Sequence, residues 1–361
     1  MTRHRDAGFT LAETLVATVL TMLVTGAVFT MINPRTAIAH AQPEASDMQQ
    51  RARVGADAVV RDLLAAGAGV DTGPDAGSLA SFLPPIIPRR MGLSGADADT
   101  VARADAVTLV WALAGFAQTT SSAILSTAAP TLALVGGPPC PGGSSLCGMN
   151  EGSDVLAFDD LGHFDLFRIA GIAGGVADLR RHAATGGYTY PAGARIVSAI
   201  ARTYYLDAVN RQLRVSDGYL SDAPVIDNVV GLTLTYFGDP APPVHPRPES
   251  GANCLYDAAG NPVVLARLAS AGSLAPLPLT MLNDGPWCGE AGNRFDADVL
   301  RIRQVRVSLR VQSGDAMFRG SGAFFAVPGT ATRADQLLPD VVITVDAAPR
   351  NLSPRSAPWS L

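Results

Sequence analysis

A single apolar stretch near the N-terminus constrains this chain more than any other feature of its sequence. Residues 9–32 carry one charged side chain, that of Glu13. As a helix with a rise of 1.5 Å per residue, such a stretch reaches about 36 Å, enough to cross the ~30 Å hydrocarbon core of a bilayer. Arg3 and Arg5 precede it, and flanking positive charge keeps that end in the cytoplasm. The sequence therefore predicts a single-pass membrane segment with the rest of the chain on the outer side.

An ordinary secretory signal peptide is the main alternative, because it also has a basic start and an apolar run. The apolar stretch is long for such a signal, and a carboxylate lies near its start. The nearest small-x-small cleavage site is Ala-Ile-Ala at residues 37–39, beyond Pro34 in a stretch expected to be helical. These features favour a retained membrane segment.

The residues at the start of the apolar stretch resemble a known processing signal. Residues 8–13, Gly-Phe-Thr-Leu-Ala-Glu, follow a short basic leader and precede a long apolar helix. This arrangement is similar to the class III signal of type IV pilins and of type II secretion pseudopilins. The resemblance implies cleavage between Gly8 and Phe9 by prepilin peptidase, which removes residues 1–8, and N-methylation of Phe9. Glu13 would then be the fifth mature residue, a position that these families use in assembly.

Residues 33–69 predict the second, amphipathic half of the same helix. Apolar residues recur at helical spacing and can cover a core, and Gly67 and Gly69 stop the helix. Asn33-Pro34 predicts an interruption, and Pro43 permits a second one. The stretch RARVGADAVVRDLLAAGAGV resembles the matching segment of PilW-type minor pilins. The expected face comprises Met48, Arg51, Val54, Ala58, Val59, Asp62 and Leu63.

Residues 70–361 predict a β-rich globular domain. Its clearest strand is QVRVSLRV, where apolar residues from Val305 to Val311 alternate with polar ones, as in a half-buried antiparallel strand. Proline- and glycine-rich segments at about 71–100, 136–153 and 238–290 predict long surface loops that are insertions. The expected strands are 107–111, 131–135, 154–158, 163–169, 194–200, 203–206, 212–215, 229–237, 300–311 and 341–345.

A second resemblance lies in this domain. The segments TYYLD (203–207) and RQLR (211–214), then VIDNVVGLTLTYF and later VRVSLRV, resemble the body of PilW-like and GspJ-like subunits. Arg350-Asn351 is similar to the "RN" that often ends these domains. The resemblance implies an α+β, type IV pilin-like fold, in which a long N-terminal helix packs on an antiparallel β-sheet.

The chain has four cysteines, Cys140, Cys147, Cys254 and Cys288. An even number in a chain exported to an oxidising compartment predicts disulfides, and four cysteines allow three pairings. Nearest-neighbour pairing, Cys140 with Cys147 and Cys254 with Cys288, would close the two loops richest in proline and glycine. Zinc binding is the weaker alternative, because the sequence has no CxxC pair and no histidine at zinc spacing from either pair.

The sequence shows no arrangement typical of catalysis. Residues 142–145 lack the second glycine of a GxSxG elbow, and neither a P-loop nor GxGxxG occurs. Asp97 and Asp99, like Asp296 and Asp298, could offer oxygen ligands to calcium, but they lack the glycine and distal glutamate of an EF-hand and are interpreted as solvated turns. The sequence predicts no enzyme, no cofactor and no metal site. The histidines are scattered and lie outside HExxH motifs, at positions 4, 40, 163, 182 and 245.

The charge of the chain argues against binding to nucleic acid. The formal net charge is −5 and every basic residue is arginine, without a basic block, so no nucleic-acid partner is expected.

The expected function is that of a minor pilin, a structural subunit at or near the tip of a type IV pilus. Its expected partners are prepilin peptidase, other minor pilins and the major pilin. It would lie in the inner membrane with a periplasmic C-terminal domain, then on the cell surface.

Two alternatives to a minor pilin stay open. One is a GspJ-like pseudopilin of type II secretion, which would share the processing signal. The other is a pilus-tip adhesin or DNA-uptake subunit whose long loops bind a ligand. Gene neighbourhood separates the first from a pilin, and binding of glycan or DNA by the domain from residue 35 onward would favour the second.

Overall fold

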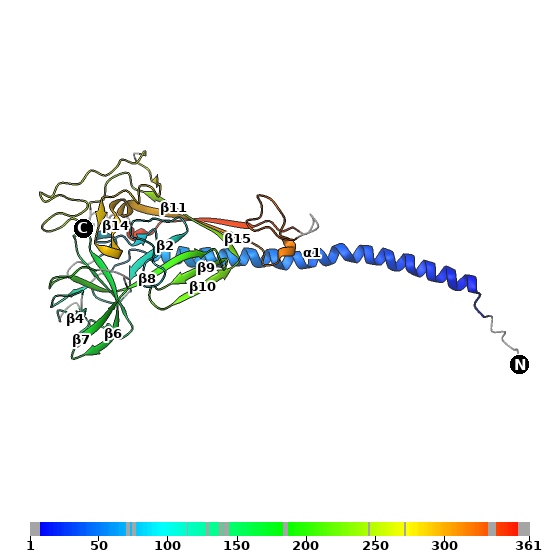
Figure 1. The fold of residues 1–361 in the computed structure, drawn as a ribbon, viewed down its shortest axis with the longest axis horizontal. Coiled ribbons are helices and arrows are strands. Elements are labelled where there is room, and N and C mark those ends of the chain that lie inside the picture. The colour runs from blue at the N-terminus through cyan, green and yellow to red at the C-terminus, as the bar shows by residue number, and fades with distance from the viewer. Residues whose placement is uncertain are drawn as a thin grey trace, which may run out of the picture. The chain divides into compact units, whose positions relative to one another are not determined.

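The computed structural model shows an α+β chain with one long N-terminal helix and antiparallel β-sheets (Figure 1). It falls into two compact units, residues 1–50 with 312–340 and residues 51–311 with 341–361, which we describe separately. The residues described are 8–69, 73, 77–113, 115–127, 130–136, 140, 144–182, 187–244, 246–270, 272–330 and 337–352, without the side chains of 32–40.

Several sequence-based expectations lie outside these residues. They include most of the leader, His4, His245 and parts of the loops expected at 71–100 and 136–153. The side chain of His40 is also outside them.

Helix α1 runs without a break from Leu11 to Ala65. It continues through Pro34 and Pro43, so the interruption predicted at Asn33-Pro34 is wrong. A proline removes one N–H donor and crowds the preceding turn, but the hydrogen bonds on either side can keep the helix as one element. The stop expected at Gly67 is confirmed: this residue has a φ of 75°, in the left-handed region that glycine adopts readily, and its N–H donates to the Val110 carbonyl at 3.0 Å.

In the first unit, polar bonds hold the 312–340 segment to the helix. Glu44 Oε1 accepts hydrogen bonds from Ser313 Oγ at 2.8 Å and from the Gly314 N–H at 2.9 Å. Within the segment, the amide of Gln312 bonds to Val327 in both directions. This loop therefore depends on side-chain hydrogen bonds for its position.

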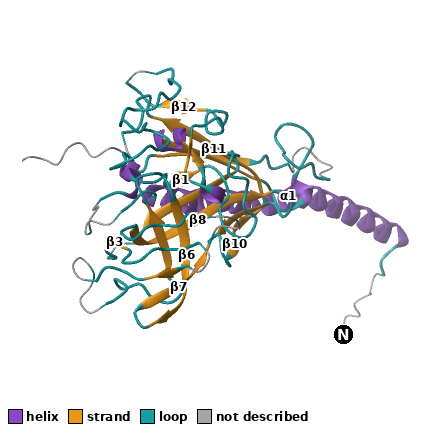
Figure 2. Ribbon diagram, turned by 60° about the vertical axis from the view of Figure 1, so that its left-hand side comes forward, coloured by secondary structure: helices purple, strands orange, loops and turns teal. Residues whose placement is uncertain are grey.

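The second unit contains a ten-stranded, a four-stranded and a two-stranded sheet, all antiparallel in their pairings (Figure 2). In the large sheet the order is β1-β2-β8-β5-β6-β7-β4, with β3 and β9 also on β8, and β10 on β9. The four-stranded order is β12-β11-β15-β16, and β13 pairs with β14. The strands of the large sheet are β1 Ile86–Ile87, β2 Ala106–Ala112, β3 Thr119–Thr120, β4 Thr131–Leu132, β5 Asp154–Phe158, β6 Phe164–Ala173, β7 Val176–Arg181, β8 Arg195–Asp207, β9 Gln212–Ser216 and β10 Asp222–Asp227. The others are β11 Val229–Gly238, β12 Ala275–Leu277, β13 Trp287–Cys288, β14 Phe295–Asp296, β15 Ile302–Val311 and β16 Val341–Ala347.

Strand β15 confirms the clearest sequence prediction. Val305, Val307, Leu309 and Val311 are buried, and Arg306 on the opposite face is exposed. β11 and β15 lie side by side over nine residue pairs (Figure 1). The strict alternation follows from a sheet that has one face on the core.

Several other strands differ from the predictions. β10 was not predicted, and β4 ends at Leu132 where a strand to residue 135 was expected. β8 joins the segments expected at 194–200 and 203–206 into one strand that pairs with β2, β3, β5 and β9. β7 was not predicted, although Gly174 and Gly175, both with positive φ, make the tight turn that joins it to β6. A Gly-Gly pair between alternating segments is a hairpin signal.

In the second unit, α1 packs on the sheets through small residues. Val59, Asp62 and Leu63 of the predicted face are buried, together with Ala52 and Ala56, and the prediction is wrong at Val54, which is 49 % exposed. A Cβ atom on Gly55 would lie 2.5 Å from Ile226 Cδ1 and 2.9 Å from Leu309 Cδ2. The absence of a side chain at Gly55 therefore permits this close approach.

The structure joins Cys140 to Cys147 and Cys254 to Cys288, which is the nearest-neighbour pairing. The second disulfide closes a loop with a sequence separation of 34, which falls in the 238–290 insertion. The first spans a separation of 7. The entropy removed from the unfolded chain grows with loop length, so the second disulfide is the more stabilising one.

We expect the paired substitution Cys254→Ala with Cys288→Ala to lower the free energy of unfolding by about 4 kcal/mol, and Cys140→Ala with Cys147→Ala by about 2 kcal/mol. Urea denaturation of the two purified variants, followed by tryptophan fluorescence, measures the difference. Equal losses, or a larger loss for the short loop, would contradict the ranking.

Candidate functional site

The N-terminal end of α1 is held by a capping box. Glu13 Oε2 accepts hydrogen bonds from the Thr10 N–H at 2.9 Å and from Thr10 Oγ1 at 2.8 Å. The Glu13 N–H donates in turn to Thr10 Oγ1 at 3.3 Å. This reciprocal arrangement satisfies donors that a helix start leaves unpaired, and it places a carboxylate at the positive end of the helix dipole. This local role was not predicted, although Thr-x-x-Glu is its recognisable signal in the sequence.

The helix that follows is the one described helix that is long and apolar enough to cross a membrane. This segment, Leu11–Met31, has 21 residues, and none of it is buried inside the protein. Its threonine hydroxyls donate to carbonyls within the helix, among them Thr18 to Leu15 at 2.9 Å and Thr21 to Ala17 at 2.7 Å. Because these hydroxyls are satisfied internally, they add little cost to an apolar environment.

The residues before the helix are uncovered. Phe9 is 87 % exposed, and a Cβ atom on Gly8 would meet no atom within 4 Å. Among the described residues, nothing therefore covers the chain at Gly8 and Phe9. A larger side chain at Gly8 would also fit this structure.

Gly8, Phe9 and Glu13 thus lie together at one helix end, but the cysteines lie elsewhere in the chain, in loops.

No family model, no curated protein sequence and no solved structure matches the chain. The function has to be argued from the chemistry of its own residues.

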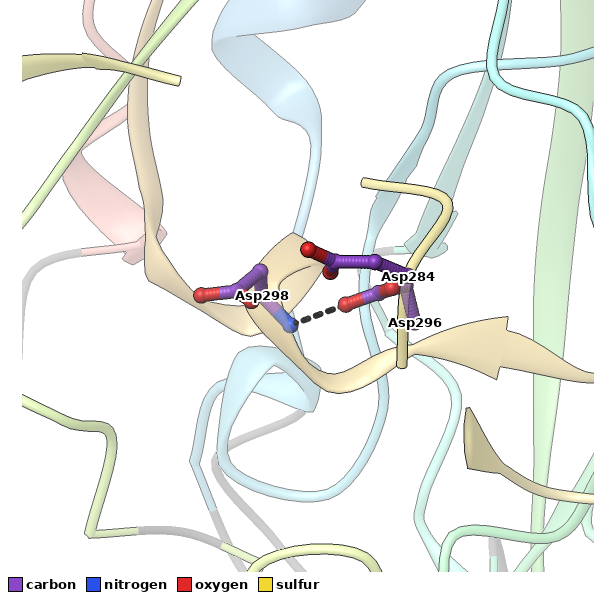
Figure 3. Close-up of side chains that lie close together, drawn as sticks. All are labelled: Asp284, Asp296 and Asp298. Atoms are coloured by element: carbon purple, nitrogen blue, oxygen red, sulfur yellow. Dashed lines mark hydrogen bonds between the residues drawn. The ribbon is translucent and has the colours of Figure 1, made fainter. Parts of the chain in front are cut away.

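In the second unit, three aspartates form a close cluster, shown in Figure 3. Asp284, Asp296 and Asp298 each offer one carboxylate oxygen, and these oxygens lie within 4.8 Å of one another. Asp296 and Asp298 are each 1 % exposed, so their interpretation as a solvated turn is wrong. This geometry is the one in the described residues that could hold a metal ion.

The hydrogen bonds of the cluster give it a structural role. Asp296 accepts bonds from the N–H groups of Asp298, at 2.9 Å, and Gly285, and so caps the 3₁₀ helix Ala297–Arg301. Asp298 Oδ1 accepts from Arg301 Nη1 at 2.7 Å. Burial raises the pKa of Asp296 to about 6 and also raises that of Asp298.

Asp97 also differs from the expected solvated turn. Its carboxylate accepts charge-assisted hydrogen bonds from Arg90 Nη2 at 2.9 Å and from Arg103 Nη1 at 3.2 Å. Burial is the largest single effect and would raise the pKa of Asp97, but the hydrogen bonds and the charges of Arg90 and Arg103 together hold this pKa below its usual value. Asp99 pairs with Arg294 at 2.9 Å. Both carboxylates are therefore used in ion pairs.

Arg301 fixes the long insertion in place. Its guanidinium donates to the carbonyls of Ala266 and Pro240, both at 2.7 Å, while the residue is 1 % exposed. The loops that it holds line a cavity of about 1110 Å³, formed by residues 239–242, 262–265, 267–270, 272–274 and Arg301. A cavity of this size in the insertion can admit a ligand.

The two histidines whose side chains are described lie beside carboxylates. His163 Nδ1 is 2.8 Å from Asp159 Oδ2, and its ring stacks on Tyr188 with centroids 3.7 Å apart. His182 Nε2 lies 3.4 Å from Asp154. These contacts could not be predicted from the sequence, because the histidine and the carboxylate of each contact are brought together only by a β-hairpin or a tight turn.

We expect the pH dependence of stability to report the buried Asp296. Its pKa is raised on folding, so ionisation opposes the folded state at neutral pH, and this penalty is relieved as pH falls from about 7 to about 4. Asp296→Asn removes the titration. Relative to this variant, the wild type should gain about 1 kcal/mol between pH 7.5 and pH 5.

Urea denaturation at the two pH values measures this gain, with the exposed Asp227→Asn as the control. An unchanged difference between wild type and Asp296→Asn at both pH values would show that Asp296 titrates normally.

Proposed function

We propose that this chain is a minor pilin, a structural subunit held in the inner membrane by α1 and then extracted into a type IV pilus at or near its tip. The observation that carries the proposal is the exposed Gly8-Phe9 bond and Glu13 at the start of a 55-residue helix. The proposed fold is type IV pilin-like, and the proposed partners are prepilin peptidase, the other minor pilins and the major pilin.

The apolar N-terminal segment of α1 and its buried C-terminal part together support a subunit that moves from a bilayer into a filament. The segment Leu11–Met31 is uncovered and apolar, so it requires lipid or other apolar helices around it. The face containing Ala52, Val59 and Leu63 is instead covered by the subunit's own sheets. A subunit that leaves a bilayer for a filament core needs an apolar helix that is free for both environments and a folded body that stays intact.

Glu13 can form a charge pair with a neighbouring subunit in the filament while it also caps its own helix. Both hydrogen bonds from Thr10 fall on Oε2, and among the described residues no donor is bonded to Oε1. Cleavage would free the Phe9 amine as a positive charge in the same layer. A neighbour's amine and this carboxylate would form a pair in low dielectric, which favours one axial stagger of the helices over others.

A GspJ-like pseudopilin of type II secretion stays a second candidate, because it would carry the same signal. Location of the gene among pilus genes favours the pilin, and location among secretion genes favours the pseudopilin. A ligand-binding tip subunit is a third candidate, favoured by the cavity of about 1110 Å³ in the 238–290 insertion. Saturable binding of glycans or DNA by the purified chain, lost when this insertion is deleted, would support it.

We expect Gly8→Leu to leave full-length, unprocessed protein in the membrane, since the structure leaves space for the larger side chain and only the peptidase would reject it. Mass spectrometry of the wild-type mature chain should find N-methylated Phe9 as its first residue. A mature chain that begins near residue 40 would instead establish an ordinary secretory signal.

Two substitutions separate the charge of Glu13 from its capping role. Glu13→Gln keeps a side-chain acceptor for the Thr10 N–H but removes the charge, whereas Thr10→Ala weakens the cap and costs about 1 kcal/mol of local helix stability. We expect both variants to be inserted and cleaved, and only Glu13→Gln to lose piliation and co-purification with other minor subunits. Normal assembly of Glu13→Gln, or equal loss in Thr10→Ala, would reduce Glu13 to a helix cap.

A further inference from the structure

Among the described residues, β16 is the outermost strand of the four-stranded sheet and its outer edge is unpaired. β16 pairs with β15 through seven consecutive residue pairs, from Val305 with Ala347 to Val311 with Val341, without a bulge. Among the described residues, no other strand pairs with β16 and no further main-chain hydrogen bond involves Val341–Ala347. In an antiparallel edge strand every second residue directs its N–H and C=O groups away from the sheet, so one side of β16 presents unused donors and acceptors.

The other sheet edges in the described part of the chain are protected. β10 contains Pro224 and an irregularity beside it, and charged residues lie at both of its ends. β12 has three residues, one of them Pro276, and β1 and β4 have two each. Short edges, prolines, bulges and charges are the devices that prevent edge pairing. β16 has none of them between Val341 and Val345.

The side chains of this edge suit a strand. All five residues from Val341 to Val345 are β-branched and uncharged. Val341 and Ile343 pack against the core but stay only partly covered, and Val342 is 59 % exposed. Asp346, the one charge in β16, is paired with Arg306 Nε at 2.7 Å. An added strand would cover the apolar side chains and satisfy the free main-chain groups at once.

We propose that β16 is a docking edge that accepts an extended segment of a different protein chain as a fifth strand of the sheet. The chemistry of the edge specifies an uncharged, β-branched segment. A second copy of this chain fits less well, because each copy carries a net charge of −5. Docking at this edge is independent of the processing at Gly8 and Phe9.

The probe is a fluorescein-labelled, capped octapeptide that alternates valine with threonine, added to the full chain in detergent micelles. We expect saturable binding by fluorescence anisotropy, and slower amide hydrogen exchange confined to Val341–Ala347. Val345→Lys places an inward-pointing charge on the edge and should weaken binding at least about tenfold, as such charges block edge pairing. The matched control Val225→Lys, in the protected edge strand β10, should bind like the wild type.

Three results would overturn the proposal. They are no saturable binding to the wild type, protection outside β16, or equal binding of the octapeptide and a version with a central proline. Because the exchange measurement uses the wild-type chain, it stays decisive if Val345→Lys fails to fold. Quantitative disulfide-linked dimers of Thr344→Cys would identify a second copy as the occupant and so overturn the assignment to a different chain.

Discussion

The body of this protein depends on how closely the C-terminal part of α1 lies on its sheets. Gly55 leaves no Cβ between the helix and the side chains of Ile226 and Leu309, and alanines flank it on the buried face. A few residues on, the buried Asp62 accepts hydrogen bonds from Tyr204 Oη at 2.7 Å and Arg202 Nη1 at 3.0 Å. Close packing and a charge-assisted network therefore attach the helix to both large sheets, because Leu309 belongs to β15 and Tyr204 to β8.

The same helix has to satisfy its polar groups where no sheet covers it. In Leu11–Met31 the threonines bond to carbonyls of their own helix, and Thr10 and Glu13 satisfy donors at its start. A segment that meets its hydrogen-bonding needs alone can remain in lipid or among other helices without changing its conformation. Such self-sufficiency would suit the proposed transfer from a bilayer to a filament core.

Much of the fold could be predicted from local pattern, whereas the polar contacts could not. The alternation in β15, the strand β5 and the stop at Gly67 each depend on a few neighbouring residues, and the structure contains them. Asp296 was interpreted as part of a solvated turn but is buried. Asp62 lies on the predicted helix face, but its partners Tyr204 and Arg202 come from a strand far along the chain and could not be predicted from local pattern. The position of Glu13 was noted for assembly, but its bonds to Thr10, three residues away, were readable from the sequence and were missed.

The net negative charge of the chain affects which partner can pair with the edge strand β16. An unprotected, β-branched edge would pair with other copies where chains are concentrated, and anchoring of the segment Leu11–Met31 in a membrane would raise their local concentration. This chain has no lysine, the residue most used to guard edges. A net charge of −5 disfavours association with like chains and leaves the main chain of the edge to a neutral or basic partner. Selectivity at this edge would thus come from repulsion between copies, and affinity from hydrogen bonds that any strand can make.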